Sequence, residues 1–155
     1  MEQATILREA MRFDIDIIRA RYANEHALSD GTAREHEREL KRFLAMCAIA
    51  PRKRYAMRGP IDAFWHTFLL FTQTYAHFCT HVAGRFIHHR PREMDPDSGA
   101  PDREAHEEFK TDYQALFGEV PSNHLWPSPP LEPGPSGAQC YPRCASPCRD
   151  PNGAK

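Results

Sequence analysis

The chain has 155 residues, of which 41% are hydrophobic, enough to form one domain with its own core. Its 20 basic and 21 acidic residues are interspersed and give a net charge of −1, so no basic surface for nucleic acid is indicated. No apolar run approaches the roughly 20 residues that span a bilayer, and no signal segment opens the chain. We therefore expect a cytoplasmic protein without nucleic-acid or membrane partners.

Two helices are predicted in the first third of the chain. A helical stripe over about residues 5–24 is formed by Ile6, Ala10, Phe13, Ile17 and Ala20. After a break at Ser29-Asp30-Gly31, Thr32 followed by Glu35 has the spacing of a capping box. The pattern predicts a second helix from there to about residue 50.

The third predicted helix is the most apolar and aromatic part of the chain. Pro60 suits the first helical position, and no residue from there to His81 breaks a helix. One face carries Ile61, Phe64, Phe68, Phe71, Tyr75, Cys79 and Val82. Asp62 and His66 fall on the opposite side, four residues apart, and are therefore neighbours. We expect one long helix that forms the wall of the core and is polar on its other side.

The remainder of the chain divides into one more helix and a tail. Gly84 is a predicted helix end, residues 91–101 have the composition of a loop, and a fourth helix is predicted over about residues 102–117. From residue 121 onward nine of 35 residues are proline, so this segment is predicted to be largely disordered, except where Leu125 and Trp126 dock on the helices. The sequence predicts an all-α helical domain of residues 1–120, with about four helices, and a flexible tail of residues 121–155.

The arrangement of short motifs between Phe43 and Trp126 is similar to that of a known family. The matching pieces are Phe43-Leu44, Ile61-Asp62-Ala63-Phe64-Trp65-His66, Tyr75, Cys79, Gly84, His88-His89-Arg90-Pro91, Tyr113, Phe117-Gly118 and Leu125-Trp126-Pro127. Together they resemble the bacterial single-domain relatives of the plant glycine-rich domain-containing proteins, a family largely of unknown function. Phe68 stands where many members carry a second histidine, and the glycine-rich region is absent. The resemblance implies a fold and a site rather than an activity.

A divalent metal site is the main functional hypothesis. Its candidate ligands are His66, His88 and His89, with Asp62 or Cys79 as a further ligand. Imidazole, carboxylate and thiolate groups make Zn²⁺ the default ion, with copper or iron as alternatives. Cys79 lies about 140° around a straight helix from His66, so not all of these residues can bind one ion. The sets that remain are Asp62 and His66 with one histidine of the pair, or Cys79 with the pair.

Other interpretations of the same residues stay open. The cluster can be a purely structural polar group, and Cys79 with His88 or His89 is the one plausible Cys–His pair for catalysis without a metal. If the protein is an enzyme, we expect a metal-dependent hydrolase or oxidoreductase. The sequence alone does not distinguish an enzyme from a binding protein. No nucleotide cofactor is expected, because phosphate-binding and dinucleotide motifs are absent. The other six histidines are expected at solvated positions; they are His26, His36, His77, His81, His106 and His124.

The tail carries a second group of candidate ligands. Cys140, Cys144 and Cys148 are spaced by four residues, which does not match a zinc ribbon but allows soft-metal binding or redox chemistry. The proline-rich segment around them can also dock a protein partner as an extended chain. The alternative to a metal protein is therefore a non-enzymatic interaction module whose histidine and aspartate cluster is structural.

Overall fold

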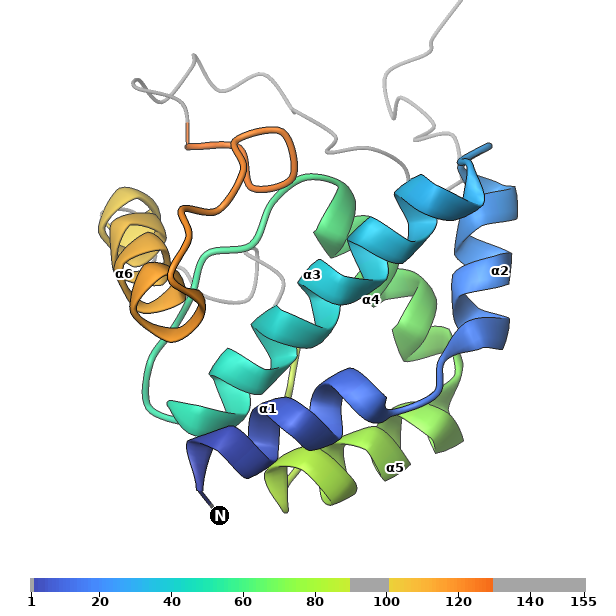
Figure 1. The fold of residues 1–155 in the computed structure, drawn as a ribbon, viewed down its shortest axis with the longest axis horizontal. Helices are drawn as coiled ribbons and strands as arrows, with labels where there is room; N and C mark the ends of the chain where they lie inside the picture. Colours follow the sequence, from blue (N-terminus) through green and yellow to red (C-terminus); the bar gives the residue numbers. More distant parts are fainter. Residues whose placement is uncertain (1, 90–100, 130–155) are drawn as a thin grey trace, which may run out of the picture.

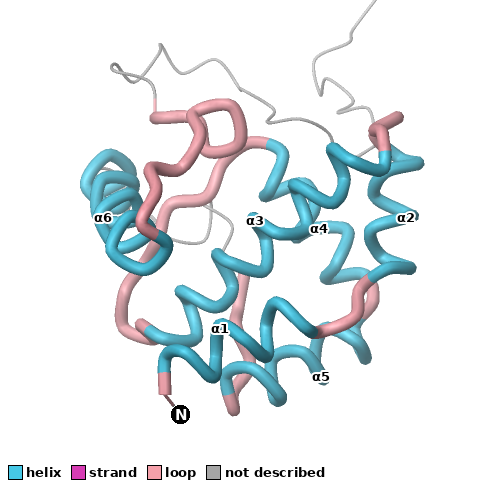
Figure 2. Tube along the Cα trace, in the orientation of Figure 1, coloured by secondary structure: helices cyan, strands magenta, loops and turns pink. Residues whose placement is uncertain are grey.

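The computed structural model describes residues 2–89 and 101–129, and within these ranges the protein is helical, with no strand (Figures 1 and 2). The helices of the described ranges are α1 Gln3–Arg12, α2 Asp16–Glu25, α3 Asp30–Ile49, α4 Pro60–Leu70, α5 Thr72–Ala83 and α6 Pro101–Phe117. The predicted all-α class is confirmed. The predicted number of helices is wrong, because two of the four predicted helices are broken. The predicted loop of residues 91–101, save its last residue, and the tail from residue 130 lie outside the described residues.

The first predicted helix is interrupted after Arg12. Phe13 has extended backbone angles, and the side chain of Asp14 accepts a hydrogen bond of 2.9 Å from the backbone N–H of Asp16. An aspartate that binds the backbone in this way favours a turn over a continued helix. The break rotates the helix that follows, so Ile18 is buried whereas Ile17 is 78% exposed. The stripe predicted to continue through Ile17 therefore ends at the break.

The helix α3 begins earlier than the sequence predicts. The side-chain oxygen of Ser29 accepts a hydrogen bond of 3.1 Å from the backbone N–H of Thr32, which makes Ser29 the N-cap. Asp30 then lies in the first turn, where its negative charge is favourable. The capping-box interpretation of Thr32 and Glu35 is wrong, because Ser29, three residues upstream, is the N-cap and Thr32 lies inside the helix.

The long third helix is divided at Phe71 into α4 and α5. Phe71 has φ −89° and ψ 63°, outside the helical region, although the sequence there contains neither glycine nor proline. The turn lets the rings of Tyr75 and Phe78 pack against Phe68, with centroid distances of 5.0 and 5.6 Å. It also brings α5 alongside α1 (Figure 1). Tertiary packing therefore overrides a continuous helical pattern here.

The centre of the fold is α3, which contacts α1, α2, α4 and α5. Its inner face meets aromatic rings from the rest of the chain: Phe43 packs against Trp65 of α4, Phe109 of α6 and Trp126. Such ring pairs stabilise a fold by more than the burial of their apolar surface alone. This aromatic cluster joins α6 and the segment after it to the N-terminal helices.

A buried carboxylate fixes the segment that follows α6. Glu39 is 3% exposed and accepts hydrogen bonds from the Tyr113 hydroxyl at 2.8 Å and the Trp126 indole N–H at 3.0 Å. Arg42 also donates to Glu39, at 3.2 Å. Leu125 and Trp126 are each 2% exposed, so the predicted docking of this pair on the helices is confirmed.

The connector between α3 and α4 lies against α6. Lys53 forms ion pairs with Asp112 and Glu108, and the Tyr55 hydroxyl donates to Asp112 at 2.6 Å. These contacts fix the path by which the chain enters α4. None of the helices in the described ranges is long and apolar enough to cross a lipid bilayer.

Candidate metal centre

The first two residues of the site stand on the outer face of α4. Gly59, with φ 81°, is the N-cap of this helix, and Pro60 occupies the first turn as predicted. The inner face is buried through Ile61, Phe64, Trp65, Thr67 and Phe68, and Asp62 and His66 lie outside this buried set. The side chains of Asp62 and His66 are 29% and 53% exposed and lie on successive turns.

The third residue, His89, comes from the segment that follows α5. Gly84 ends α5 in the left-handed conformation, as predicted. The chain then returns along α5, where the Tyr75 hydroxyl donates to the carbonyl oxygen of Ile87 at 2.6 Å. The N–H of Ile87 donates to the sulfur of Cys79 at 3.5 Å. Buried Ile87 is thus held on both of its backbone groups, which directs His89 toward α4.

Trp65 completes the support of His89. Its indole ring lies edge-on to the imidazole, with centroids 4.5 Å apart. The indole N–H donates to the Tyr75 hydroxyl at 3.1 Å, so the two groups that position His89 are bonded to each other. The side chain of His89 is 14% exposed, the lowest value in the site. The imidazole of His89 is therefore fixed before any ligand is added.

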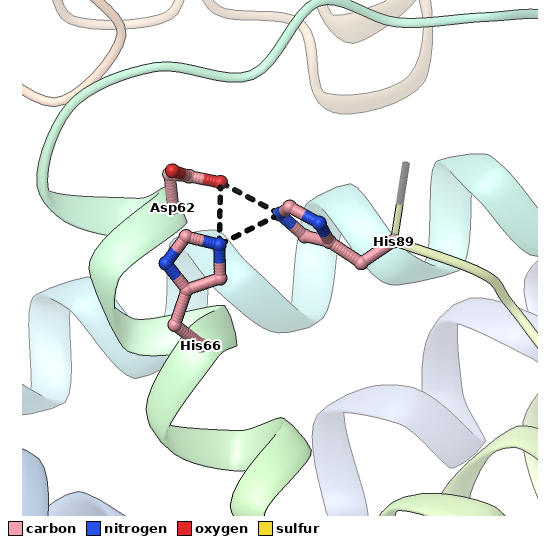
Figure 3. A group of neighbouring side chains, drawn as sticks. All are labelled: Asp62, His66 and His89. Atoms are coloured by element: carbon pink, nitrogen blue, oxygen red, sulfur yellow. Dashed lines mark hydrogen bonds and ion pairs between the residues drawn. The ribbon is translucent and has the colours of Figure 1, made fainter. Parts of the chain in front are cut away.

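Asp62, His66 and His89 converge on one point (Figure 3). The Nε2 atom of His89 lies 2.9 Å from Oδ1 of Asp62 and 3.1 Å from Nε2 of His66. The Nε2 atom of His66 lies 3.8 Å from the same carboxylate oxygen. One carboxylate and two imidazole groups thus present three ligand atoms to a common centre, an arrangement that can hold a metal ion or form a hydrogen-bonded cluster.

The two remaining candidates near this site lie outside the group. The ring of His88 is exposed and packs against Phe86, with centroids 4.9 Å apart. Cys79 is fully buried, and burial raises the pKa of its thiol, which disfavours the thiolate that would bind a metal or act as a nucleophile. The structure therefore assembles the set of Asp62 and His66 with one histidine of the pair. The candidates Cys140, Cys144 and Cys148 lie outside the described residues.

Two histidines expected in solvent are buried instead. His36 is 4% and His106 3% exposed. His36 Nδ1 lies 2.9 Å from the Tyr22 hydroxyl, which itself donates to the carbonyl oxygen of Pro60 at 3.0 Å. The prediction that these two histidines are solvated is wrong, because segments distant in the sequence contact their surroundings: Pro60 bonds the tyrosine beside His36, and Ser128 faces His106. His106 faces Ser128 of the segment after α6.

The sequence does not reveal the supporting role of Tyr75. The sequence places Tyr75 on the apolar face of a helix, where its ring is expected in the core. The signal that could have revealed more is its hydroxyl, because a buried tyrosine hydroxyl usually has a hydrogen-bond partner. The identity of that partner depends on the path of residues 85–89, which periodicity does not specify.

Comparison with models of known protein families places the chain in a family. Residues 2–115, which include α1 to α5, the three clustered side chains and most of α6, match the UCP032817-like family. No curated protein and no solved structure matches the chain. The match covers well over half of the 155 residues. The chain therefore belongs to the UCP032817-like family.

Proposed function

We propose that the protein binds a divalent transition-metal ion through Asp62, His66 and His89. Zn²⁺ is the default ion, with copper or iron as alternatives. The observation that supports this most directly is the set of distances between the three ligand atoms, because hydrogen bonding alone does not require all three to face one centre.

The distances suit a small ion. Ligand atoms about 2.0–2.1 Å from a tetrahedral Zn²⁺ ion lie about 3.3 Å from one another. The observed separations of 2.9, 3.1 and 3.8 Å fall on both sides of this value. A point about 2 Å from all three atoms therefore exists at the positions that they already hold.

The donor types narrow the choice of ion. Two imidazole nitrogens with one carboxylate oxygen are a ligand set of catalytic zinc sites and of non-haem iron sites. Calcium and magnesium prefer oxygen ligands, and of the three residues only the carboxylate of Asp62 provides one. These ligand types favour zinc or iron, and imidazole is a suitable ligand for copper as well.

The experiment is metal analysis of the full chain purified without a histidine tag, followed by calorimetric titration with Zn²⁺. One equivalent of metal is expected. Asp62→Ala, His66→Ala and His89→Ala should each weaken binding by at least about tenfold to a hundredfold, the scale on which even supporting residues of a metal site act. His88→Ala is the matched control, because it removes an exposed imidazole next to His89.

A wild-type chain that takes up no zinc, copper or iron would end the proposal. Equal loss of binding in His88→Ala and His89→Ala would end the assignment of His89 as the ligand. Circular dichroism of each variant separates loss of a ligand from loss of the fold.

A purely structural cluster is the second candidate function. Its support is the 2.9 Å contact between His89 and Asp62, which ties the segment after α5 to α4 without any ion. In this case His89→Ala would lower the unfolding temperature, while wild type and variant would both lack stoichiometric metal.

Three wider expectations stay with this proposal. We infer kinship with the glycine-rich domain-containing proteins from the motifs shared between Phe43 and Trp126, and a cytoplasmic location from the same sequence features as above. The proline-rich tail is the segment proposed to dock a protein partner, with Cys140, Cys144 and Cys148 as a second metal or redox group.

A further inference from the structure

The three ligand side chains are unequally buried, and this decides where a ligand could approach the ion. His89 is 14% exposed and is covered by Trp65, whereas Asp62 is 29% and His66 53% exposed. The face of the cluster formed by α4 is therefore open to solvent, and the side formed by the segment after α5 is closed. An ion held by these three residues would be reachable from the α4 side.

Three protein ligands leave a tetrahedral ion with one further position. In the part of the chain that the structure describes, the two other candidate ligands from this region, His88 and Cys79, make contacts elsewhere. The ring of His88 packs against Phe86, and the Cys79 sulfur accepts the hydrogen bond from Ile87. Structural zinc sites have four protein ligands, whereas catalytic sites have three and keep the fourth position for water or substrate. The arrangement corresponds to the second kind.

The charge of such a site selects the ligand. A divalent ion with one carboxylate and two neutral imidazoles keeps a net charge of about +1. This residual charge favours an anionic donor over a neutral or cationic one, and it acts at a partly exposed position where a small ligand can enter without displacing the core.

We propose that the metal centre of this protein has an open coordination position on the α4 side that binds small anions, with water in their absence. This inference rests on the proposed metal function and goes beyond it. A carboxylate or similar oxygen anion is the class of ligand expected. The same position would polarise a bound carbonyl or activate a bound water molecule.

The experiment uses Co²⁺ in place of Zn²⁺, because the visible absorption of Co²⁺ reports its ligands. The full chain is loaded with one equivalent of Co²⁺ in chloride-free buffer and titrated with azide and, separately, with acetate. A saturable shift of the visible bands by both anions is expected. His88→Ala should show the same shift, and His66→Ala, which weakens binding at this site, should lose the bands that the anions shift.

Each failure has its own signature. Cobalt bands that azide and acetate leave unchanged would overturn the open position while leaving metal binding intact. A near-ultraviolet thiolate band that disappears both in His66→Ala and when Cys140, Cys144 and Cys148 are together changed to serine would also overturn it, because the tail would then supply the fourth ligand to this ion. Absence of bound Co²⁺, zinc, copper and iron would overturn the metal function itself and this inference with it.

Discussion

The hydroxyl group of Tyr75 donates a hydrogen bond of 2.6 Å to the carbonyl oxygen of Ile87, and thereby connects α5 to the segment that carries His89. The same oxygen of Tyr75 accepts the indole N–H of Trp65, whose ring lies against His89. One tyrosine thus holds both the backbone two residues before the proposed ligand and the ring that packs on that ligand. Tyr75 is a positioning residue for the site.

Replacing Tyr75 with phenylalanine should weaken metal binding by about tenfold or more, because residues that orient a metal ligand act on this scale. The free energy of unfolding should also fall by about 1–3 kcal/mol, since the buried carbonyl oxygen of Ile87 and the Trp65 N–H lose their partner. Calorimetric titration with Zn²⁺ measures the first quantity, and urea denaturation of the metal-free protein measures the second.

The matched control is Tyr113→Phe, which removes another buried hydroxyl, bonded to Glu39 and distant in sequence from the site. This variant should lose stability and keep the metal affinity of the wild type. Equal affinities of Tyr75→Phe and wild type would remove the positioning role from Tyr75.

Gly59 is the N-cap of α4 and should not tolerate a side chain. Its φ of 81° disfavours other residues, and an added Cβ would lie 2.9 Å from Cδ of Pro127, closer than real Cβ contacts. We expect Gly59→Ala to lower the free energy of unfolding by about 1–3 kcal/mol, from backbone strain and overpacking together. Urea denaturation measures this change.

Gly31→Ala is the control for Gly59→Ala. Gly31 lies in the first turn of α3, and a Cβ there meets nothing closer than the Ser29 hydroxyl oxygen at 3.9 Å. Alanine should leave stability unchanged or raise it by up to about 1 kcal/mol, because glycine is a poor helix former. A Gly59→Ala protein as stable as Gly31→Ala would contradict the tight approach of Pro127 to α4.

Acid should destabilise the protein through His36. Burial lowers the pKa of His36 below its ordinary value of 6.5. The nearby charge of Glu35 raises this pKa, whereas His124 and His26 lower it further. Its Nδ1 faces the Tyr22 hydroxyl, while its Nε2 is buried without a hydrogen-bond partner among the described residues. The folded state therefore favours the neutral ring, and a proton on Nε2 would be buried unpaired.

The unfolded chain takes up this proton at higher pH than the folded protein. The free energy of unfolding therefore has its full contribution from neutral His36 above pH 6.5, and this contribution decreases as the pH falls below 6.5. Urea denaturation of metal-free protein at several pH values measures the effect. His36→Asn, which keeps a donor near Nδ1 but does not titrate, should show a weaker pH dependence. His106, whose pKa is also lowered by burial, should account for part of the remainder. A protein that becomes more stable on acidification would contradict this assignment.

Glu39 should be the most costly single carboxylate to remove among those discussed here. It accepts hydrogen bonds from Tyr113, Trp126 and Arg42 inside the core. Glu39→Ala leaves these donors unpaired, so we expect the free energy of unfolding to fall by about 3–5 kcal/mol. Trp126 should become more exposed, which its fluorescence reports.

Glu119→Ala is the comparison for Glu39→Ala, because Glu119 pairs with the same arginine, Arg42, but its side chain is 54% exposed. An exposed ion pair is worth about 1 kcal/mol or less. Similar losses of stability in the two variants would show that Glu39 stabilises the protein through its ion pair with Arg42 and not through the buried hydrogen bonds.

Local sequence determined the parts of this protein that depend on neighbours along the chain. The 3.6-residue period gave the all-helical class, Pro60 and Gly84 marked the start of α4 and the end of α5, and a spacing of four put Asp62 beside His66. Each of these follows from backbone geometry within one or two helical turns.

The tertiary structure alone decided which further residues meet Asp62 and His66. The choice of His89 over His88 depends on the hydrogen bonds of Ile87 to Tyr75 and Cys79, which no periodicity encodes. The break at Phe71 and the burial of His36 likewise depend on segments distant in the chain that cover them. Contacts of this kind are set by how helices pack together, and the same local pattern is compatible with several such packings.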